Sequence, residues 1–269
     1  MNISIFHDGG SKFWHPIAED WLNKDHIIRH CPNYSVWRNF RPNLILFEYC
    51  NNNVFRYTNQ FVKEHGKAKK VVVRAHGVGI RYNIYKFVNW DYVDDLIFVS
   101  DHLKRMTDGW DFKNTQIHIV HNGINLNRFT LKKSFKPTYK LAYVGRWVPF
   151  KGIDKLPEIV ERFKKVDSRY ELYCATGNIK DINTWLEDKD YLIHPSTIES
   201  FSYVVGEALA KGIRPLINKW EGAEEIWGNE FFIDDFNLEQ DPLRFRKIIE
   251  DKYDQKRMIE EINKICGIG

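Results

Sequence analysis

The sequence has few cysteines, and their spacing excludes the sites that cysteines usually build. Four cysteines occur in 269 residues, and no two of them form a C-x-x-C pair. They are Cys31, Cys50, Cys174 and Cys266. Because zinc sites and disulfide frameworks need clustered cysteines, the pattern predicts four reduced thiols in a cytosolic protein.

Long apolar runs are also missing. No stretch approaches the roughly eighteen uninterrupted apolar residues that a membrane-spanning helix requires. The amino-terminal segment MNISIFHDGG has a short apolar run followed by polar residues, which is neither a secretory signal nor a membrane span. We therefore expect a cytoplasmic protein with no transmembrane segment.

Charge of one sign does not dominate the chain. Lys and Arg number 40 against 36 Asp and Glu, a net charge of +4. This mild excess suits anionic small molecules or weak contact with a phosphate-rich surface, and does not by itself indicate nucleic acid. Hydrophobic residues make up 43% of the chain, which is ample for a packed core and argues against disorder.

The chain instead alternates strand-like and helix-like segments. Most strand-like runs are continuously apolar, which is typical of parallel strands buried on both faces. These ten runs are residues 3–6, 44–49, 71–75, 96–100, 117–120, 140–145, 170–175, 191–195, 214–218 and 231–234. Segments with helical periodicity lie between them, for example residues 153–166 and 202–212. The alternation predicts an α/β protein with doubly wound parallel sheets.

Ten strands are many for one sheet in a chain of this length, so we expect two Rossmann-like domains that face a cleft. The polar, basic segment 131–140 has no apolar period and predicts the seam. The predicted domains are residues 1–132 and 133–250, followed by a C-terminal helix over 251–269. This helix belongs to a charged helical segment, 240–266, able to pack on either domain. Ligands of such folds bind at the carboxyl ends of the strands.

The segment HPSTIESFSYVVGEALAKG, residues 194–212, combines a strand end, a loop and a helix. Glu199 precedes the helix and Glu207 lies eight residues later, a distance of roughly 12 Å along a helix axis. The helix N-terminus between them attracts phosphate. A ligand with hydroxyls at both ends and a diphosphate in the middle, a nucleotide-sugar, would match. The alternative is purely structural, with a serine N-cap and Glu207 in solvent.

The segment KLAYVGRWVPFKGIDKL, residues 140–156, runs from a strand through a glycine-containing loop into a helix. Gly145 and Gly152 allow close approach of a backbone. Arg146 and Lys151 are spaced to clamp two phosphates, the guanidinium with forked hydrogen bonds and the ammonium as a point charge. Taken alone, such residues are usually solvated loop cations.

Together the two segments resemble the retaining nucleotide-sugar glycosyltransferases of the GT-B fold, the large family 4 group. VGRWVPFKG matches the family's G-R-x(n)-K-G loop, and HPSTIESFSYVVGEALAKG matches its P-S-x-x-E-x-F-[GS]-x-x-x-x-E-A segment. VHNGINLNRF, residues 120–129, is similar to the stretch that precedes the family's second domain. The resemblance is strongest over residues 118–230.

The resemblance implies roles for the four charged residues. Arg146 and Lys151 would hold the donor diphosphate and stabilise charge on the leaving nucleotide. Glu207 would bond the ribose hydroxyls. Glu199 would contact the transferred sugar near the reacting carbon.

It also implies a donor-binding role for backbone groups. Gly145 would lie against the donor, and the N–H groups around Phe201, Ser202 and Tyr203 would meet the distal phosphate. The loop at residues 177–180 would lie near the base.

The amino-terminal half resembles the family more loosely. Gly9 and Gly10 follow the first strand and are similar to the glycine loop beside the diphosphate; the alternative is a plain turn. His76 and Gly77 stand at a strand end where the family often has His-Gly next to the donor sugar; the alternative is a structural histidine. Ser100 would approach the donor.

The acceptor site is the least constrained by the resemblance, because family members are usually much longer in this half. Glu48, Tyr49 and Asn51 stand at the end of the strand-like run 44–49 and face the expected cleft. They would bind acceptor hydroxyls, or else form an ordinary loop.

The resemblance thus implies a metal-independent, retaining hexosyltransferase that needs no cofactor. Its donor is a nucleoside-diphosphate sugar, with UDP favoured, and its acceptor is a saccharide or lipid-linked hydroxyl. Basic runs that contain aromatic residues fit peripheral membrane contact. Two alternatives are transfer to a modified base of DNA and a non-catalytic sugar-nucleotide-binding protein.

Overall fold

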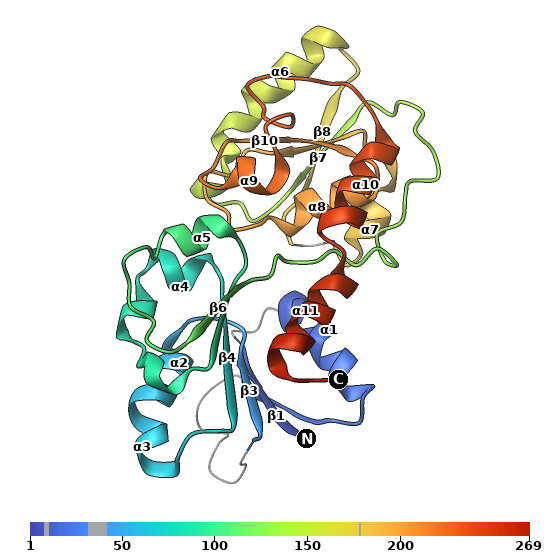
Figure 1. Ribbon diagram of the computed structural model, residues 1–269. Coiled ribbons are helices and arrows are strands. Elements are labelled where there is room, and N and C mark those ends of the chain that lie inside the picture. Colours follow the sequence, from blue (N-terminus) through green and yellow to red (C-terminus); the bar gives the residue numbers. More distant parts are fainter. Residues whose placement is uncertain (8–10, 32–41, 178) are drawn as a thin grey trace. The chain divides into compact units, whose positions relative to one another are not determined.

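The computed structural model describes residues 1–7, 11–31, 42–177 and 179–269 (Figure 1). The chain divides into two compact units. Unit 1 comprises residues 1–122 and 257–269, and unit 2 comprises residues 123–256.

Unit 1 is built on a six-stranded parallel sheet with the order β2-β1-β3-β4-β5-β6. Its strands are β1 (Asn2–Phe6), β2 (Ile27–Cys31), β3 (Leu44–Phe47), β4 (Lys70–Ala75), β5 (Asp95–Phe98) and β6 (Gln116–Ile119). The strand order reverses between β1 and β3, and such switch points form ligand sites at the carboxyl ends of the strands.

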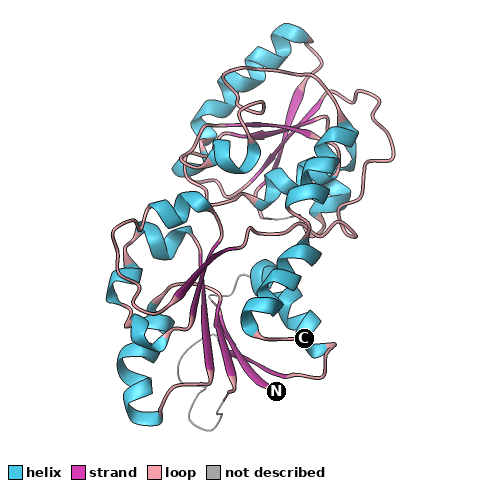
Figure 2. Cartoon of the chain, viewed as in Figure 1, coloured by secondary structure: helices cyan, strands magenta, loops and turns pink. Residues whose placement is uncertain are grey.

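The continuous apolar runs arise because the inner strands of unit 1 contribute side chains to two cores, one on each face of the sheet. In β4, Val72 packs in one cluster, while Val71 and Val73 pack in the other. Helices cover both faces of the sheet (Figure 2). They are α1 (Ser11–Leu22), α2 (Asn52–Arg56), η2 (Tyr57–Phe61), α3 (Val62–His65), α4 (Gly77–Arg81), η3 (Ile84–Phe87), η4 (Trp90–Tyr92), α5 (Asp101–Arg105) and α11 (Gln255–Cys266). The predicted doubly wound α/β architecture is confirmed.

Unit 2 has a four-stranded parallel sheet with the order β10-β9-β7-β8. Its strands are β7 (Lys140–Val144), β8 (Glu171–Ala175), β9 (Tyr191–His194) and β10 (Arg214–Ile217). Its helices are η5 (Pro149–Lys151), η6 (Ile153–Lys155), α6 (Leu156–Val166), α7 (Ile182–Trp185), η7 (Leu186–Asp188), α8 (Tyr203–Ala210), α9 (Ala223–Trp227) and α10 (Pro242–Lys252). Val205 and Leu209 of α8 pack on one face, and Phe163 of α6 packs on the other.

Two strand expectations were wrong. Residues 231–234 form no strand, and only an isolated bridge joins Phe232 to Ile217. Strand β2 was missed because Arg29 and His30 interrupt its apolar pattern, which an edge strand with exposed side chains tolerates.

The charged segment 240–266 is two helices rather than one. The α10 and α11 helices are interrupted at Tyr253 and Asp254, where the backbone of Ile124 intervenes: its N–H donates to the Tyr253 carbonyl over 2.7 Å, and its carbonyl accepts from Gln255 N–H over 3.1 Å. Most of α11 then belongs to unit 1, where Met258 and Ile262 complete a core. Sequence periodicity alone cannot place such a break, because the backbone that fills it comes from a distant segment.

The polar segment 131–140 lies wholly inside unit 2, whereas the contacts divide the chain after Asn122. The N–H groups of Thr138 and Tyr139 donate to the Asp190 carboxylate over 2.8 and 2.7 Å. Lys132, which is buried, donates to the Lys189 carbonyl. The segment is polar because it runs along the amino end of β9 and is held there by these hydrogen bonds.

Candidate functional site

Two loops of unit 2 are locked together at the carboxyl ends of β7 and β9. The carbonyl of Phe150 accepts hydrogen bonds from the Thr197 N–H over 2.9 Å, the Thr197 hydroxyl over 3.1 Å and the Ser196 hydroxyl over 3.2 Å. Gly152 has φ of +67°, and a Cβ at this position would lie 2.0 Å from the Pro195 carbonyl oxygen. Gly152 is therefore required both by its conformation and by the close approach.

This contact brings Lys151 and Glu199 together. The Lys151 ammonium donates to Glu199 Oε1, and both side chains are largely buried, with 18% and 15% of their surfaces exposed. Burial raises the pKa of Glu199, but the hydrogen bonds and charges of His194 and Lys151 outweigh it and lower the pKa to about 2. The carboxylate is thus ionised and fixed in position at neutral pH.

His194 is the site residue that the sequence reasoning missed. It is the last residue of β9, and its Nε2 lies 3.2 Å from Glu199 Oε1 and 3.0 Å from Ser202 Oγ. The available signal was its position directly before the Pro-Ser of the motif.

Arg146 is exposed at the start of the same loop as Lys151. Its guanidinium lies 5.7 Å from the centre of the Phe150 ring, and the Lys151 ammonium lies at the same distance from that ring. Within the described part of the chain, no hydrogen bond or ion pair engages the Arg146 guanidinium. Gly145 is adjacent, and a Cβ there would meet the Tyr143 hydroxyl at 3.1 Å.

The turn before α8 is anchored in the core. Phe201 is 1% exposed, and its carbonyl accepts from Trp227 Nε1 over 2.8 Å. Ser202 has φ of +68° and precedes Tyr203, the first residue of α8. The Phe201 side chain is buried in the core and anchors this turn. The backbone N–H groups of the turn lie at the start of a helix, where they can bind an anion.

Glu207 lies on α8 and is 4% exposed. This burial excludes the solvated position that the structural alternative required. The α8 helix packs closely against Ile124, since a Cβ at Gly206 would lie 2.7 Å from the Ile124 side chain. Burying a carboxylate on the second turn of α8 costs free energy unless polar groups bind it.

In unit 1, His76 belongs to a buried polar network at the carboxyl ends of β3 and β4. Its Nε2 lies 2.9 Å from Glu48 Oε1, which also accepts from Arg74 Nη1 over 2.7 Å. Arg74 Nη2 donates to Asn122 Oδ1 over 2.6 Å. Burial lowers the pKa of His76, and the hydrogen bond to Glu48 opposes this effect. A proton on Nε2 makes Nδ1 the acceptor nitrogen of this histidine.

The other predicted residues of unit 1 are placed as follows. Glu48 is fully buried, and its carboxylate is engaged by the network. The Tyr49 ring lies 4.8 Å from the His76 ring. Asn51 caps α2 by accepting from the Asn53 N–H over 2.9 Å. Ser100 caps α5 and is 1% exposed.

Three further placements complete the list of predicted positions. Gly9 and Gly10 lie outside the described residues. At residues 177–180 the turn after β8 is described except for position 178.

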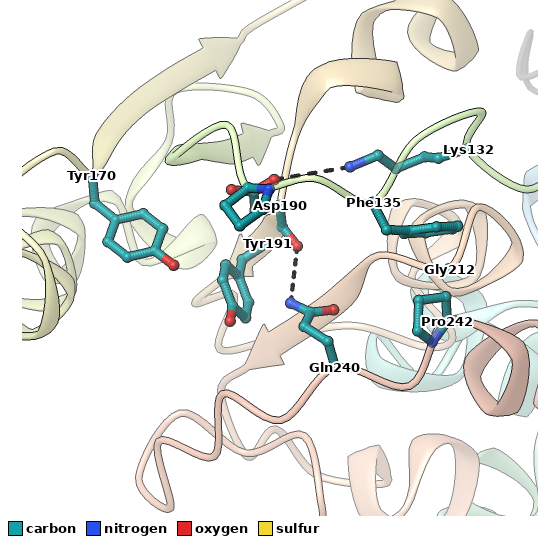
Figure 3. A pocket seen from close by; sticks show the side chains of 9 residues that line it. Lys132, Phe135, Tyr170, Asp190, Tyr191, Gly212, Gln240 and Pro242 are labelled. Atoms are coloured by element: carbon teal, nitrogen blue, oxygen red, sulfur yellow. Dashed lines mark hydrogen bonds and ion pairs between the residues drawn. The ribbon is translucent and has the colours of Figure 1, made fainter.

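A small hollow of about 90 Å³ lies elsewhere in unit 2, at the amino end of β9 (Figure 3). Lys132 points at Asp190 across 3.9 Å, and Gln240 donates to the Asp190 carbonyl over 3.3 Å. The motif residues follow the opposite end of the strand, so this hollow is separate from the candidate site.

Among the residues that the structure describes, His, Cys, Asp and Glu form no group of three able to hold a metal ion. In the same residues, every helix is too short or too polar to cross a membrane.

No protein-family model matches the sequence, and no curated protein matches it. Solved structures do match the fold. Sucrose-phosphate synthase from Thermosynechococcus elongatus aligns with a TM-score of 0.75 at 11% identity, over 98% of both chains. HepE from Anabaena, solved with UDP and glucose, aligns with a TM-score of 0.62 at 14% identity, again over 98% of both.

TarM from S. aureus, solved with UDP and other ligands, aligns with a TM-score of 0.63 at 16% identity. The match covers 82% of this chain and 55% of TarM, so the chain spans about half the length of that protein. Two Rossmann-like units with parallel sheets, together with these likenesses, establish that the chain has the GT-B fold.

Proposed function

We propose that the protein is a retaining glycosyltransferase that uses a nucleoside-diphosphate sugar, with UDP as the favoured nucleotide. The observation that carries the proposal is the Lys151–Glu199 pair at the start of α8, with Glu207 buried further along the helix. The matched HepE and TarM structures contain UDP, and the pneumococcal transferase GtfA was solved with UDP and GlcNAc. These names support a UDP-sugar donor.

The donor diphosphate binds between the loop of Arg146 and Lys151 and the turn before α8. Arg146, exposed beside Phe150, supplies forked hydrogen bonds, and Lys151 supplies a compact charge. The N–H groups around Phe201, Ser202 and Tyr203 add the positive end of the helix dipole. Charge that develops on the leaving diphosphate is therefore stabilised by cationic side chains and N–H groups that are already in position. Such preorganised electrostatic stabilisation is usually the largest single contribution to catalysis, and in this proposal it needs no divalent ion.

The two glutamates bind the ends of the donor. Glu199, held by Lys151 and His194, accepts hydrogen bonds from hydroxyls of the transferred sugar. Glu207, buried on α8, accepts from the ribose hydroxyls.

In unit 1, His76 is the proposed contact to the donor sugar, while Gly9 and Gly10 lie outside the described residues. Glu48 holds the His76 ring through Nε2 and therefore acts as a positioning residue rather than as a direct acceptor ligand. Tyr49, beside the His76 ring, remains a proposed acceptor contact.

Transfer then proceeds with retention. The acceptor hydroxyl attacks the anomeric carbon from the face that the diphosphate leaves, and its proton passes to the leaving phosphate oxygen. Glu199 is paired with a cation, so it serves the sugar hydroxyls better than it would serve as a covalent nucleophile. The acceptor is a saccharide or lipid-linked hydroxyl, whereas a DNA base and a non-catalytic binding role gain no support from the comparisons.

A ligand screen tests the proposal. The protein is heated with UDP, GDP, ADP and their glucose, galactose and N-acetylglucosamine conjugates, and the melting temperature is recorded. A ligand at about 100 times its dissociation constant stabilises the fold by about 2.7 kcal/mol. We expect UDP and one or more UDP-sugars to raise the melting temperature. We also expect the protein to release UDP slowly from the UDP-sugar when no acceptor is present. A screen in which no nucleotide stabilises the protein would refute the proposal.

A further inference from the structure

The side chain of His194 is enclosed where β9 ends. It is 2% exposed, and the Trp220 ring packs against it edge-on, with ring centres 5.6 Å apart. Its Nε2 nevertheless reaches two polar groups, Ser202 Oγ at 3.0 Å and Glu199 Oε1 at 3.2 Å. Because buried polar groups need hydrogen-bond partners, these two contacts are part of the packed structure around this imidazole.

A serine, a histidine and a carboxylate in contact resemble a hydrolase triad, but the geometry excludes that relay. In a triad the base meets the serine through one ring nitrogen and the acid through the other. Here Ser202 and Glu199 approach the same nitrogen. A proton on Nε2 is shared as a donor between the carboxylate and the hydroxyl oxygen, so the arrangement holds groups in place and does not activate the serine.

The two groups held by His194 stand at opposite ends of one turn. Glu199 opens the turn, and Ser202 closes it immediately before α8. Ser202 has φ of +68°, a conformation that residues other than glycine rarely adopt, so the turn needs outside support to keep its shape. The hydrogen bond from His194 supplies that support at the strained residue.

We propose that His194 is a positioning residue that clamps both ends of the turn 199–202, aiming the Glu199 carboxylate at the donor sugar and the turn's N–H groups at the donor diphosphate. The inference rests on the proposed function, because the two ligand groups are those of a nucleotide-sugar. His194 thereby joins the sugar-binding and phosphate-binding halves of the donor site through one nitrogen.

Three titratable groups of the described structure face Glu199: the Lys151 ammonium, the His194 imidazole and the nearby Tyr143 phenol. The loss of His194 removes a hydrogen-bond donor from Glu199 and leaves the Lys151 ammonium in place, so both the orientation of Glu199 and its pKa should change.

The test compares His194→Ala with His194→Gln, since a glutamine amide places an N–H where Nε2 stands. UDP affinity is measured by calorimetry and UDP release from a stabilising UDP-sugar is measured between pH 5 and pH 8. We expect His194→Ala to lower kcat by about 10- to 100-fold, as a misplacement near 1 Å can do. His194→Gln should recover most of that loss. Unchanged kcat and KM in a folded His194→Ala variant would overturn the inference.

Ser202→Ala tests the other end of the clamp, because it removes the hydroxyl that His194 holds and keeps a side chain at φ of +68°. We expect UDP affinity to fall by about 3- to 10-fold. Ser202→Gly removes the same hydroxyl but relieves the backbone strain, so its loss of affinity should be smaller. A Ser202→Ala variant with wild-type UDP affinity would contradict a clamp that acts at both ends.

A second readout separates this inference from the proposed function. If wild-type protein binds no nucleotide, the proposed function fails, yet the clamp is still measured by NMR titration of the Glu199 carboxyl carbon, assigned with Glu199→Gln. Wild-type Glu199, with a pKa of about 2, is ionised at pH 4. In His194→Ala the midpoint of this titration should move upward by about one pH unit, and in His194→Gln it should move less. An unmoved midpoint would overturn the clamp itself.

Discussion

The Thr197 N–H donates to the carbonyl oxygen of Phe150 over 2.9 Å and thereby joins two loops that lie 47 residues apart in the sequence. Each loop carries half of the candidate donor site, Lys151 on one and Glu199 on the other. The pairing of these two charges is therefore a property of the backbone contact between the loops, which suggests where the site is most sensitive to change.

Gly152→Ala should disrupt this contact. Alanine is strained at φ of +67°, and its Cβ would lie 2.0 Å from the Pro195 carbonyl oxygen, so the loops must move apart. We expect a loss of about 2–4 kcal/mol in the free energy of unfolding and weaker UDP binding. Gly228→Ala is the control, because φ is +76° there but no atom lies within 4 Å of the added Cβ. Equal losses in urea unfolding of the two variants would contradict the close-approach argument.

Lys151→Met should depress turnover more than donor affinity. The ammonium is worth most when charge develops on the leaving diphosphate, so we expect kcat to fall by about 100- to 1,000-fold. Lys155→Met is the control on the same segment, since that exposed ammonium contacts only the Asn218 side chain, at 3.2 Å, among the described residues. Steady-state release of UDP separates the two variants, and a Lys151→Met enzyme with wild-type kcat would exclude the assigned role.

Glu207→Ala should weaken nucleotide binding by about 1–3 kcal/mol, the usual cost of losing a buried hydrogen-bond partner. Calorimetry with UDP and with its 2′-deoxy and 3′-deoxy analogues tests the ribose assignment directly. Wild-type protein should discriminate against one or both analogues, whereas the variant should bind all three nearly alike. Discrimination that survives the substitution would place the ribose elsewhere.

Removing only one partner of the buried Arg74–Glu48 ion pair should lower the free energy of unfolding strongly. Arg74→Met leaves a carboxylate that is 0% exposed without its guanidinium, and we expect a loss of about 3–5 kcal/mol in unfolding free energy. Combining it with Glu48→Gln should recover part of that loss, because the second change removes the buried charge. Urea unfolding measures both variants, and a double variant no more stable than Arg74→Met alone would refute the coupling.

The stability contributed by Glu199 should depend on pH in a defined direction. Its pKa in the folded protein, about 2, is lower than its usual value of 4.5, so the ionised form is favoured by folding. The contribution is therefore complete above pH 4.5 and is lost as the pH falls from there toward 2. The stability difference between wild type and Glu199→Gln, followed by urea unfolding from pH 7 to pH 3, should shrink only below pH 4.5.

Much of the fold was readable in the sequence because its signals are local. Nine of the ten predicted strand runs overlap observed strands, since parallel strands covered on both faces must be continuously apolar. The segments around Lys151 and Glu199 were singled out by their resemblance to two motifs of a glycosyltransferase family, and their role in donor binding stays a prediction.

Contacts between distant segments decided the remainder. The sequence spacing of Glu199 and Glu207 was visible, but the burial of Glu207 depends on how closely α8 packs on Ile124. The break between α10 and α11 exists because the backbone of Ile124 occupies it. The roles of His194 and Glu48 follow from partners in space, Ser202 for one and His76 for the other. By itself the sequence determined the kinds of segments and the chemistry they carry, and tertiary structure decided which polar groups meet, because burial and pairing arise only when remote segments pack together.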